Sequence, residues 1–192
     1  MEYKYIMSNH ITTYTGLYFE PTNPDGSKIC IEDIAHALSM TCRGNGHVKS
    51  FWSVGEHCIL CAKEAALRGY PDRLVLACLL HDASECYMSD LPRPFKLELP
   101  EYKKLETRLL AIIYEHFLGS ALSEEEETLL KEIDDAFLWY DLTCLLNEKP
   151  EEDEPEVHIK PDYRVRPFEE VEREYLAMFR QYDLQVQRGA GS

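Results

Sequence analysis

The sequence is short of basic residues, of long hydrophobic runs and of paired cysteine motifs. Of its 192 residues, 20 are Lys or Arg and 35 are Asp or Glu, so the formal net charge is −15. Because such a surface repels phosphates, the composition argues against binding to nucleic-acid polymers or to anionic lipid. It does not exclude a small phosphorylated ligand held by a local cation or metal ion.

Long hydrophobic segments are absent, since the longest run, Leu74 to Leu80, has seven residues, whereas about 20 are needed to span a bilayer. The first ten residues, MEYKYIMSNH, lack the basic-then-apolar pattern of a signal peptide. Seven cysteines are an odd number, and Cys58 and Cys61 form a CxxC motif without a second pair. We therefore expect a cytoplasmic protein with free thiols and no membrane contact, whose CxxC pair packs on a helix face.

The acidic residues are concentrated in one region. Residues 124–156 contain fourteen Asp or Glu and two Lys. Ser123 and Glu126 form a capping box, which places the acids at 124–127 at the helix end that favours negative charge. The acids at 148–156 predict a solvated loop. Most of the charge is thus expected to act in solvation rather than in chemistry.

The hydrophobic periodicity predicts one all-α domain over residues 1–192, with a small β-hairpin at 11–24. Three prolines, at 92, 94 and 100, predict an extended loop over residues 90–100. We expect a core formed by residues 28–147, with the apolar segment 74–80 at its centre. The predicted helices run from Glu32 to the RGNG turn at 43–46, from 54 to 68, from 71 through 80, and over 101–117, 124–147 and 168–182.

A polar pair, His81-Asp82, follows the most apolar helix, where burial makes such side chains costly. Glu85 lies four residues after His81 and three after Asp82, so the three side chains can converge near one helix end. His57 flanks the apolar stripe of the preceding helix, and Asp134 lies on a later one. Two imidazoles and two carboxylates on a helical core predict a site for one divalent ion, such as Mn, Co, Fe, Ni, Zn or Mg.

A divalent ion in this site would lower the pKa of a bound water and polarise a phosphoryl oxygen, with Glu85 close enough to handle a proton. The alternative is that His57 and His81 are satisfied core histidines and Asp134 is a capped or paired surface acid. For a single residue the two interpretations are about equal. The four ligand candidates, in this order along the chain, favour the metal site.

The order His57, His81-Asp82, Asp134 resembles the H…HD…D pattern of the HD-domain phosphohydrolases. The resemblance extends to IEDIAHALS (31–39), SVGEH (53–57), LLHDASE (79–85), DLPRPFK (90–96) and KEIDD (131–135). These segments are similar to the 5′-deoxynucleotidase branch, which includes the YfbR-like and prophage YfdR-like proteins. The resemblance covers about residues 12–182 and implies an HD-domain helical bundle that forms a homodimer.

The same resemblance implies a metal-dependent nucleotidase that hydrolyses 2′-deoxynucleoside 5′-monophosphates to nucleoside and phosphate. It assigns four metal ligands and two residues that manage protons, Glu85 and Asp82. It also implies an arginine that orients the phosphate, Arg43, whose alternative is a surface position at a helix end. The implied metal ligands are His57, His81, Asp82 and Asp134, and the implied substrate contacts are Arg43, Asp90, Leu91, Pro92 and Arg93.

Several positions keep alternatives. Asp135 is the fallback for Asp134. His47 contacts either the substrate or the local backbone, and Lys96 either attracts the phosphate or lies at the surface, which is slightly favoured. Gly44 stands where relatives often carry an aromatic residue that crowds the sugar, so selectivity against ribose is open.

Two rival functions also stay open. A deoxynucleoside triphosphohydrolase would need several cations for the extra phosphates, and the motifs offer only Arg43, Lys49, Arg93 and Lys96. A non-catalytic HD module would bind nucleotide without turnover. The intact ligand set argues against that second rival.

Overall fold

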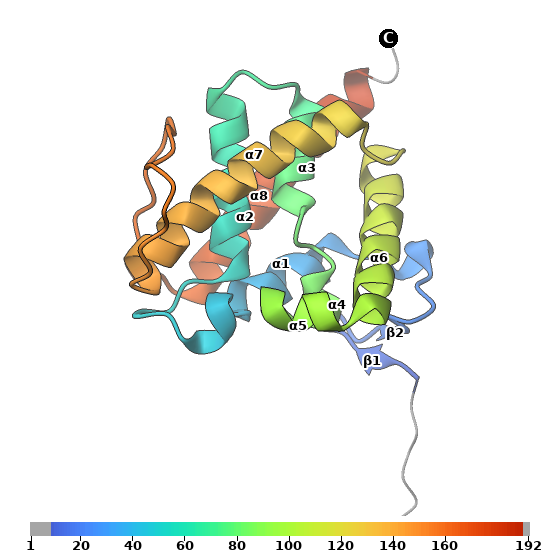
Figure 1. Cartoon of the computed structure of the whole chain (residues 1–192). Helices are drawn as coiled ribbons and strands as arrows, with labels where there is room; N and C mark the ends of the chain where they lie inside the picture. The colour runs from blue at the N-terminus through green and yellow to red at the C-terminus, as the bar shows by residue number, and fades with distance from the viewer. Residues whose placement is uncertain (1–8, 190–192) are drawn as a thin grey trace, which may run out of the picture.

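The helices and strands of the computed structural model, which describes residues 9–189, follow the apolar periodicity of the chain (Figure 1). The fold is all-α with one small β-hairpin, as expected. Residues 1–8, most of the segment MEYKYIMSNH, lie outside the described part, as do residues 190–192. The elements are β1 (Ile11–Thr12), β2 (Tyr18–Phe19), the 3₁₀ turn η1 (Gly26–Lys28), α1 (Ile31–Met40), the 3₁₀ turn η2 (Arg43–Gly46), α2 (Val54–Leu67), α3 (Asp72–Leu80), α4 (Glu85–Met88), α5 (Arg93–Glu98), α6 (Pro100–Leu118), α7 (Glu124–Tyr140), the π-helical turn η3 (Asp141–Leu145) and α8 (Phe168–Gly189).

Helix α3 lies at the centre of the fold, because its apolar residues cover its whole circumference. Every residue from Leu74 to Leu80 is buried. The helix packs against α2, α6, α7 and α8, and α7 runs diagonally across α2 and α3 in Figure 1. The expected burial of this segment is confirmed. The C-terminal end of α3 therefore lies in the interior of the fold.

The hairpin contributes to the core, so the expected start of the core at residue 28 is wrong. β1 and β2 are antiparallel. Phe19 of β2 is fully buried and stacks on Tyr87 with ring centroids 4.1 Å apart. The buried Asp33 of α1 accepts hydrogen bonds from the backbone N–H (2.7 Å) and hydroxyl (3.0 Å) of Thr15. These contacts tie the hairpin to α1.

The C-terminal helix α8 also belongs to the core, and it runs past its predicted end at 182 to Gly189. Val171, Tyr175 and Phe179 recur at intervals of four residues and are buried. The hydroxyl of Tyr175 donates a hydrogen bond to the carbonyl of Leu79 in α3 (2.6 Å). The expected end of the core at residue 147 is wrong, because the apolar stripe of α8 covers α3.

The prediction of an extended loop over residues 90–100 is wrong as well. Pro92 precedes the first residue of α5, Pro94 lies in its first turn, and Pro100 begins α6. A proline is tolerated in the first turn of a helix because that position has no intrahelical acceptor for an N–H. The three prolines therefore mark two helix starts, which place α5 beside α6.

The long segment from 148 to 167 has no helix or strand but is tied to the helices. Glu64, buried on α2, accepts hydrogen bonds from the backbone N–H groups of His158 (2.8 Å) and Ile159 (3.2 Å). The capping box that starts α7 is present, with Ser123 and Glu126 bonded reciprocally. Within residues 9–189 no helix is both long and apolar enough to cross a membrane.

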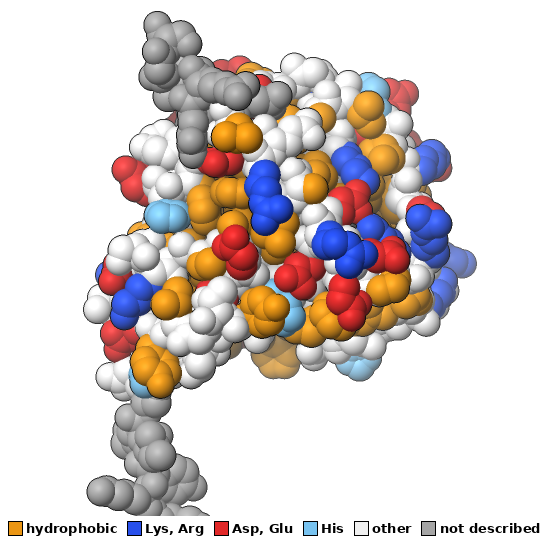
Figure 2. Space-filling view, turned by 180° about the vertical axis from the view of Figure 1, so that it is seen from behind, with side chains coloured by type: hydrophobic (Ala, Val, Ile, Leu, Met, Phe, Trp, Pro, Cys, Tyr) orange, Lys and Arg blue, Asp and Glu red, His pale blue; other side chains and the backbone are white. Residues whose placement is uncertain are grey.

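The face turned away from the viewer in Figure 1 carries acidic and basic side chains next to one another (Figure 2). This face is therefore not a patch of one sign. All seven cysteines lie within the described residues and are free, as expected.

Candidate metal centre and pocket

His57 is held in place by a buried capping box at the start of α2. The hydroxyl of Ser53 accepts a hydrogen bond from the N–H of Glu56 (3.1 Å), and the carboxylate of Glu56 accepts one from the N–H of Ser53 (2.9 Å). Both side chains are buried. The sequence S-V-G-E fits the capping-box pattern, although we did not predict it. His57 follows in the first turn, fully buried.

His81 ends α3 with its ring fixed in one orientation. Its Nδ1 lies 2.8 Å from the carbonyl of Cys78. Nδ1 therefore carries a proton and donates a hydrogen bond to that carbonyl. Its Nε2 lies 3.3 Å from Asp82 Oδ2 and 3.6 Å from Asp134 Oδ1. This Nε2 is buried and, among the described residues, has no hydrogen-bond partner. A buried nitrogen that faces two carboxylates suits a bound cation.

Asp134 lies close to both histidines. Its Oδ1 lies 3.0 Å from Nε2 of His57 and 3.6 Å from Nε2 of His81. The neighbouring Asp135 instead forms an ion pair with Lys131, with oxygen–nitrogen distances of 2.6 and 2.7 Å. The geometry thus places Asp134, and not the fallback Asp135, at the predicted ligand position.

The four candidate ligands, here called the cluster, stabilise one another's charges. They are His57, His81, Asp82 and Asp134. Burial and Arg43 lower the pKa of His57, but Cys61, Asp134 and Asp141 raise it well above its ordinary value. Burial likewise opposes ionisation of Asp134, yet its hydrogen bond with His57 and its proximity to His81 hold its pKa well below its usual range. A divalent cation can replace the protons in such a cluster, because metal binding requires neutral imidazole and ionised carboxylate.

Arg43, in turn η2, lies against this cluster. Its Nε and Nη2 donate to Oδ2 of Asp141 at 3.2 and 3.1 Å, and Nη1 lies 3.4 Å from Oδ2 of Asp82. The hydroxyl of Tyr163 donates to Oδ1 of the same Asp141 (2.8 Å). Oδ2 of Asp141 also lies 3.5 Å from Nδ1 of His57. The alternative of a surface arginine therefore does not describe Arg43.

Glu85, at the start of α4, is a buried carboxyl with one oxygen unpaired. Its Oε1 accepts a hydrogen bond from Lys96 (3.2 Å), and its Oε2 has no partner among the described residues. Burial, followed by the charges of Asp82 and Asp90, raises its pKa well above the ordinary value. Lys96 also donates to Glu106 (2.7 Å), and its side chain is 26% exposed, so it is neither free at the surface nor fully buried.

All predicted substrate contacts lie around one hollow of about 750 Å³. Gly44 has φ of 59°, a conformation that favours glycine, and leaves one wall of the hollow without a side chain. Two of the candidate metal ligands, Asp82 and Asp134, reach the same hollow, as do Glu85 and Asp141. The predicted contacts around it are Arg43, His47, Asp90, Leu91, Pro92 and Arg93, and its apolar wall is Val48, Phe95, Leu138, Leu142 and Leu146.

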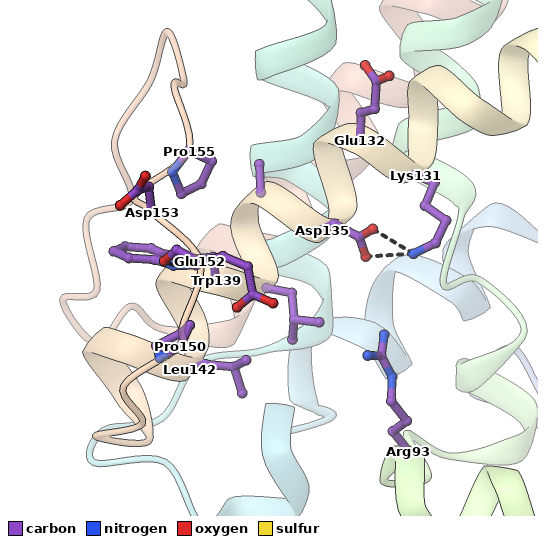
Figure 3. Close-up of a pocket in the computed structure, with 12 residues that line it drawn as sticks. Arg93, Lys131, Glu132, Asp135, Trp139, Leu142, Pro150, Glu152, Asp153 and Pro155 are labelled. Carbon is purple, nitrogen blue, oxygen red and sulfur yellow. Dashed lines mark hydrogen bonds and ion pairs between the residues drawn. The ribbon is translucent and has the colours of Figure 1, made fainter.

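A second hollow, of about 510 Å³, opens between the outer face of α7 and the acidic loop (Figure 3). The indole of Trp139 donates to the carbonyl of Glu152 (3.0 Å) and ties the loop to α7. Arg93, Leu138 and Leu142 line both hollows, so the two open side by side. The two predicted histidine ligands line neither hollow, because they lie deeper in the fold.

Three side chains of the site were not assigned a role from the sequence. Asp141 lies two turns after Asp134 on the same helical face, a spacing that signals proximity. Tyr163 belongs to a segment without periodicity, so no pattern indicates it. Cys61 follows His57 by one helical turn, and its Sγ lies 3.6 Å from Nε2 of that histidine.

The comparisons with known proteins supply relatives without a stated activity. No protein-family model matches the chain. The chain is 37% identical over 107 residues to the "Uncharacterized protein YfdR" of Escherichia coli strain K12, which covers 56% of this chain and 57% of that protein. It is 36% identical over 109 residues to the "Uncharacterized protein RCAP_rcc00048" of Rhodobacter capsulatus, over 54% of this chain and 55% of that protein. The chain spans about half the length of the curated relatives it matches.

Proposed function

We propose that the protein is a metal-dependent phosphohydrolase that converts 2′-deoxynucleoside 5′-monophosphates to nucleoside and phosphate. The observation that carries this proposal is the position of Arg43. Its guanidinium lies 3.4 Å from Asp82, a candidate metal ligand, and lines the hollow that Asp134 also reaches. A metal centre alone suits many reactions, but a guanidinium beside it favours a phosphate as the group that reacts.

The residues of the cluster fit a divalent ion. Nε2 of His57, Nε2 of His81, Asp82 and Asp134 would hold it, and the carbonyl of Cys78 fixes the ring of His81 from behind. When bound, a divalent ion supplies Lewis-acid polarisation of a phosphoryl oxygen and a nucleophile at neutral pH. This donor set of imidazole and carboxylate accepts Mn, Co, Fe, Ni, Zn or Mg.

The other residues bind the phosphate and handle protons. Arg43 offers a planar fork of N–H donors that matches two phosphate oxygens. The unpaired Oε2 of Glu85 holds or accepts a proton inside the hollow, while Lys96 fixes Oε1. A carboxyl with a raised pKa suits proton transfer near neutral pH. Asp82 shares this role with Glu85.

The charge of the hollow favours one phosphate over three. Six acidic side chains and three Lys or Arg line it. Two of these cations, Arg43 and Lys96, are already paired with carboxylates. The hollow therefore needs the charge of a bound metal ion to attract an anion, and it offers little for additional phosphates. This distribution supports a monophosphate substrate.

The apolar wall supports a nucleoside as the remainder of the substrate. Leu138 of α7, Leu142 of η3 and Leu146, which follows η3, recur at intervals of four residues, and Val48 and Phe95 line the same hollow. A volume of about 750 Å³ falls in the range of about 300–1,000 Å³ that small-molecule sites occupy. The combination of an apolar wall with a metal centre and one arginine suits a nucleotide better than a small phosphate ester.

Activity assays test this proposal directly. The protein, loaded with Mn²⁺ or Co²⁺, is incubated with separate panels of deoxy- and ribonucleoside mono- and triphosphates. We expect inorganic phosphate and nucleoside from the deoxynucleoside monophosphates. Release of free triphosphate would instead identify a triphosphohydrolase. Tight nucleotide binding without turnover under every metal condition would identify a binding module. Size-exclusion chromatography with light scattering measures the molar mass in solution and so tests the expected homodimer.

A further inference from the structure

The cysteines of α2 lie against the same histidines as the carboxylates do. Cys61 is 1% exposed and lies one helical turn after His57, with its Sγ 3.6 Å from Nε2 of that ring. One donor atom each of His57, Cys61 and His81 lie within 4.8 Å of one another, and all three residues are buried. The proposed reaction gives this thiol no task.

We propose that Cys61 is a further ligand of the metal centre and gives it a second binding mode for thiophilic ions such as Zn²⁺ and Cd²⁺. In this mode His57, His81 and Cys61 hold the ion. Soft thiolate ligands prefer such ions, whereas Mn²⁺ and Mg²⁺ prefer carboxylate oxygen. Hard ions therefore bind through Asp82 and Asp134 and leave the thiol protonated.

The distance between Cys61 and His57 fits this second mode. In a tetrahedral zinc site with Zn–S of about 2.3 Å and Zn–N of about 2.0 Å, sulfur and nitrogen are about 3.5 Å apart. Cys61 Sγ and His57 Nε2 are 3.6 Å apart. Nε2 of His81 has no hydrogen-bond partner among the described residues and is free to bind the ion. Asp134, 3.0 and 3.6 Å from the two Nε2 atoms, offers the fourth ligand.

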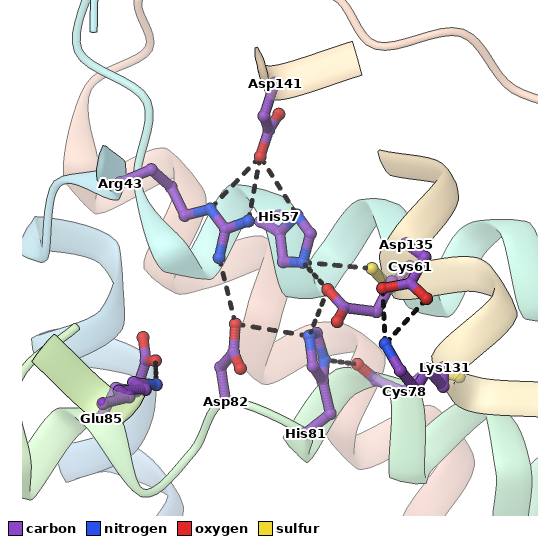
Figure 4. Close-up of polar contacts among 12 residues, drawn as sticks. Arg43, His57, Cys61, Cys78, His81, Asp82, Glu85, Lys131, Asp135 and Asp141 are labelled. Atoms are coloured by element: carbon purple, nitrogen blue, oxygen red, sulfur yellow. Dashed lines mark hydrogen bonds and ion pairs between the residues drawn. The ribbon is translucent and has the colours of Figure 1, made fainter. Parts of the chain in front are cut away.

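The ligands differ in depth, which separates the two modes. Asp134 can join either mode, but the side chain of Asp82 is 20% exposed and faces the hollow, whereas His57 and Cys61 are buried. Figure 4 shows the sulfur of Cys61 beside the ring of His57. An ion bound to the thiol thus lies on the inner side of the two histidines. Because it occupies both imidazoles, neither His57 nor His81 can then bind an ion on the side that faces the hollow. We expect Cd²⁺ in excess to inhibit the proposed reaction. This inhibition rests on the proposed function, but the binding does not.

The binding step is balanced without a redox partner. The S–H bond of Cys61 breaks, a bond forms between its sulfur and the ion, and the proton leaves to the solvent. Sulfur and metal keep their oxidation states. Thiol ligation thus releases one proton more than binding by the same histidines without the thiol.

Titration of the whole metal-free chain with Cd²⁺ tests the inference, because thiolate ligation produces charge-transfer absorption in the ultraviolet. We expect one equivalent of this signal in the wild type and in Cys144→Ser, which removes an exposed thiol. We expect Cys61→Ser to lose the signal, release one proton fewer per ion, and bind Mn²⁺ as the wild type does. Equal signals in Cys61→Ser and wild type would overturn the proposal. So would loss of the signal only in Cys58→Ser, since Cys58 lies near His81 and Asp82.

X-ray absorption of the wild-type protein with one equivalent of Zn²⁺ gives an answer that does not depend on a variant folding. We expect one sulfur in the coordination shell, and a shell of nitrogen and oxygen alone would refute the thiol ligand. A protein that shows this sulfur but hydrolyses no nucleotide would refute the proposed function and leave the present inference standing.

Discussion

Asp141 accepts two hydrogen bonds from Arg43 through a single carboxylate oxygen, with Nε at 3.2 Å and Nη2 at 3.1 Å from Oδ2. Its other oxygen accepts a hydrogen bond from the hydroxyl of Tyr163 (2.8 Å). Oδ2 lies also 3.5 Å from Nδ1 of His57. Asp141 therefore connects the guanidinium proposed to bind the phosphate with a proposed metal ligand, and Tyr163 fixes this carboxylate.

The Tyr163→Phe substitution tests this connection. It removes one hydrogen bond to a carboxylate, a contact worth about 1.5–3 kcal/mol, and frees Asp141 to turn. We expect kcat/KM for a deoxynucleoside monophosphate to fall about 10-fold, which corresponds to about 1.4 kcal/mol. Mn²⁺ affinity should change little, because Tyr163 does not contact the cluster ligands. Steady-state kinetics and a metal titration measure the two effects. Tyr18→Phe, at an exposed tyrosine of the hairpin, is the control, and equal kinetics for both variants would contradict the prediction.

Two adjacent aspartates on α7 give a matched pair for the metal centre. We expect Asp134→Ala to lower Mn²⁺ affinity about 100-fold or more. Loss of a residue that only hydrogen-bonds to a metal ligand already lowers metal affinity about 10–100-fold. Asp135→Ala should leave affinity unchanged. It breaks an exposed ion pair with Lys131, worth about 0.5 kcal/mol. Calorimetric titration with Mn²⁺ compares the variants. A larger loss in Asp135→Ala than in Asp134→Ala would show that the ligand assignment is reversed.

The sequence predicts much of the centre because its residues sit on elements with strong local signals. His57 and Asp134 flank apolar stripes that must face the core, and His81 follows a helix that is apolar all round. Burying these stripes against one another brings the three polar side chains together. The all-α fold with its hairpin follows from the same periodicity.

Other contacts depend on the path of segments that carry no such signal. Tyr163 reaches Asp141 from the stretch between η3 and α8, whose course is set by hydrogen bonds to Glu64 on a distant helix. Hydrophobic periodicity of two or 3.6 residues indicates strands and helices, but it does not predict the course of a segment that forms neither. The prolines of the 90–100 region were misassigned for another reason. Pro92 and Pro100 are compatible both with a loop and with helix starts, and packing of α5 against α6 decides between them.

The buried capping box of α2 gives a prediction on stability. Ser53→Ala removes the acceptor for the N–H of Glu56 in the turn that carries His57. The expected loss is about 1–2 kcal/mol in the free energy of unfolding, at the upper end of the range for N-caps because the site is buried. Ser123→Ala removes the corresponding hydroxyl from the exposed box of α7 and should cost about 0.5–1 kcal/mol. Urea unfolding of both variants measures the difference, and an equal or larger loss in Ser123→Ala would contradict it.

Glu85 gives a prediction in which stability and activity change in opposite directions. Its pKa in the folded protein is raised by burial and then by Asp82 and Asp90, so the folded state binds this proton more tightly than the unfolded state does. The resulting stabilisation is fully present below the unfolded pKa, about 4.3. It is lost as the pH rises through the raised folded value. As the pH rises, the metal-free wild type therefore bears a growing cost from the burial of this carboxyl, which Lys96 only partly offsets.

Glu85→Gln removes that cost and also removes the group proposed to handle a proton. We expect the metal-free variant to exceed the wild type in free energy of unfolding by about 0.5–2 kcal/mol at pH 8, with a smaller difference at pH 5. Its kcat should fall about 100-fold or more, while bound Mn²⁺ is retained. Glu106→Gln, which also removes a partner of Lys96 but lies outside the hollow, should keep its activity. If Glu85→Gln turned over substrate at the wild-type rate, Glu85 would have no part in proton transfer. If it gained no stability at pH 8, the buried carboxylate would carry no such cost.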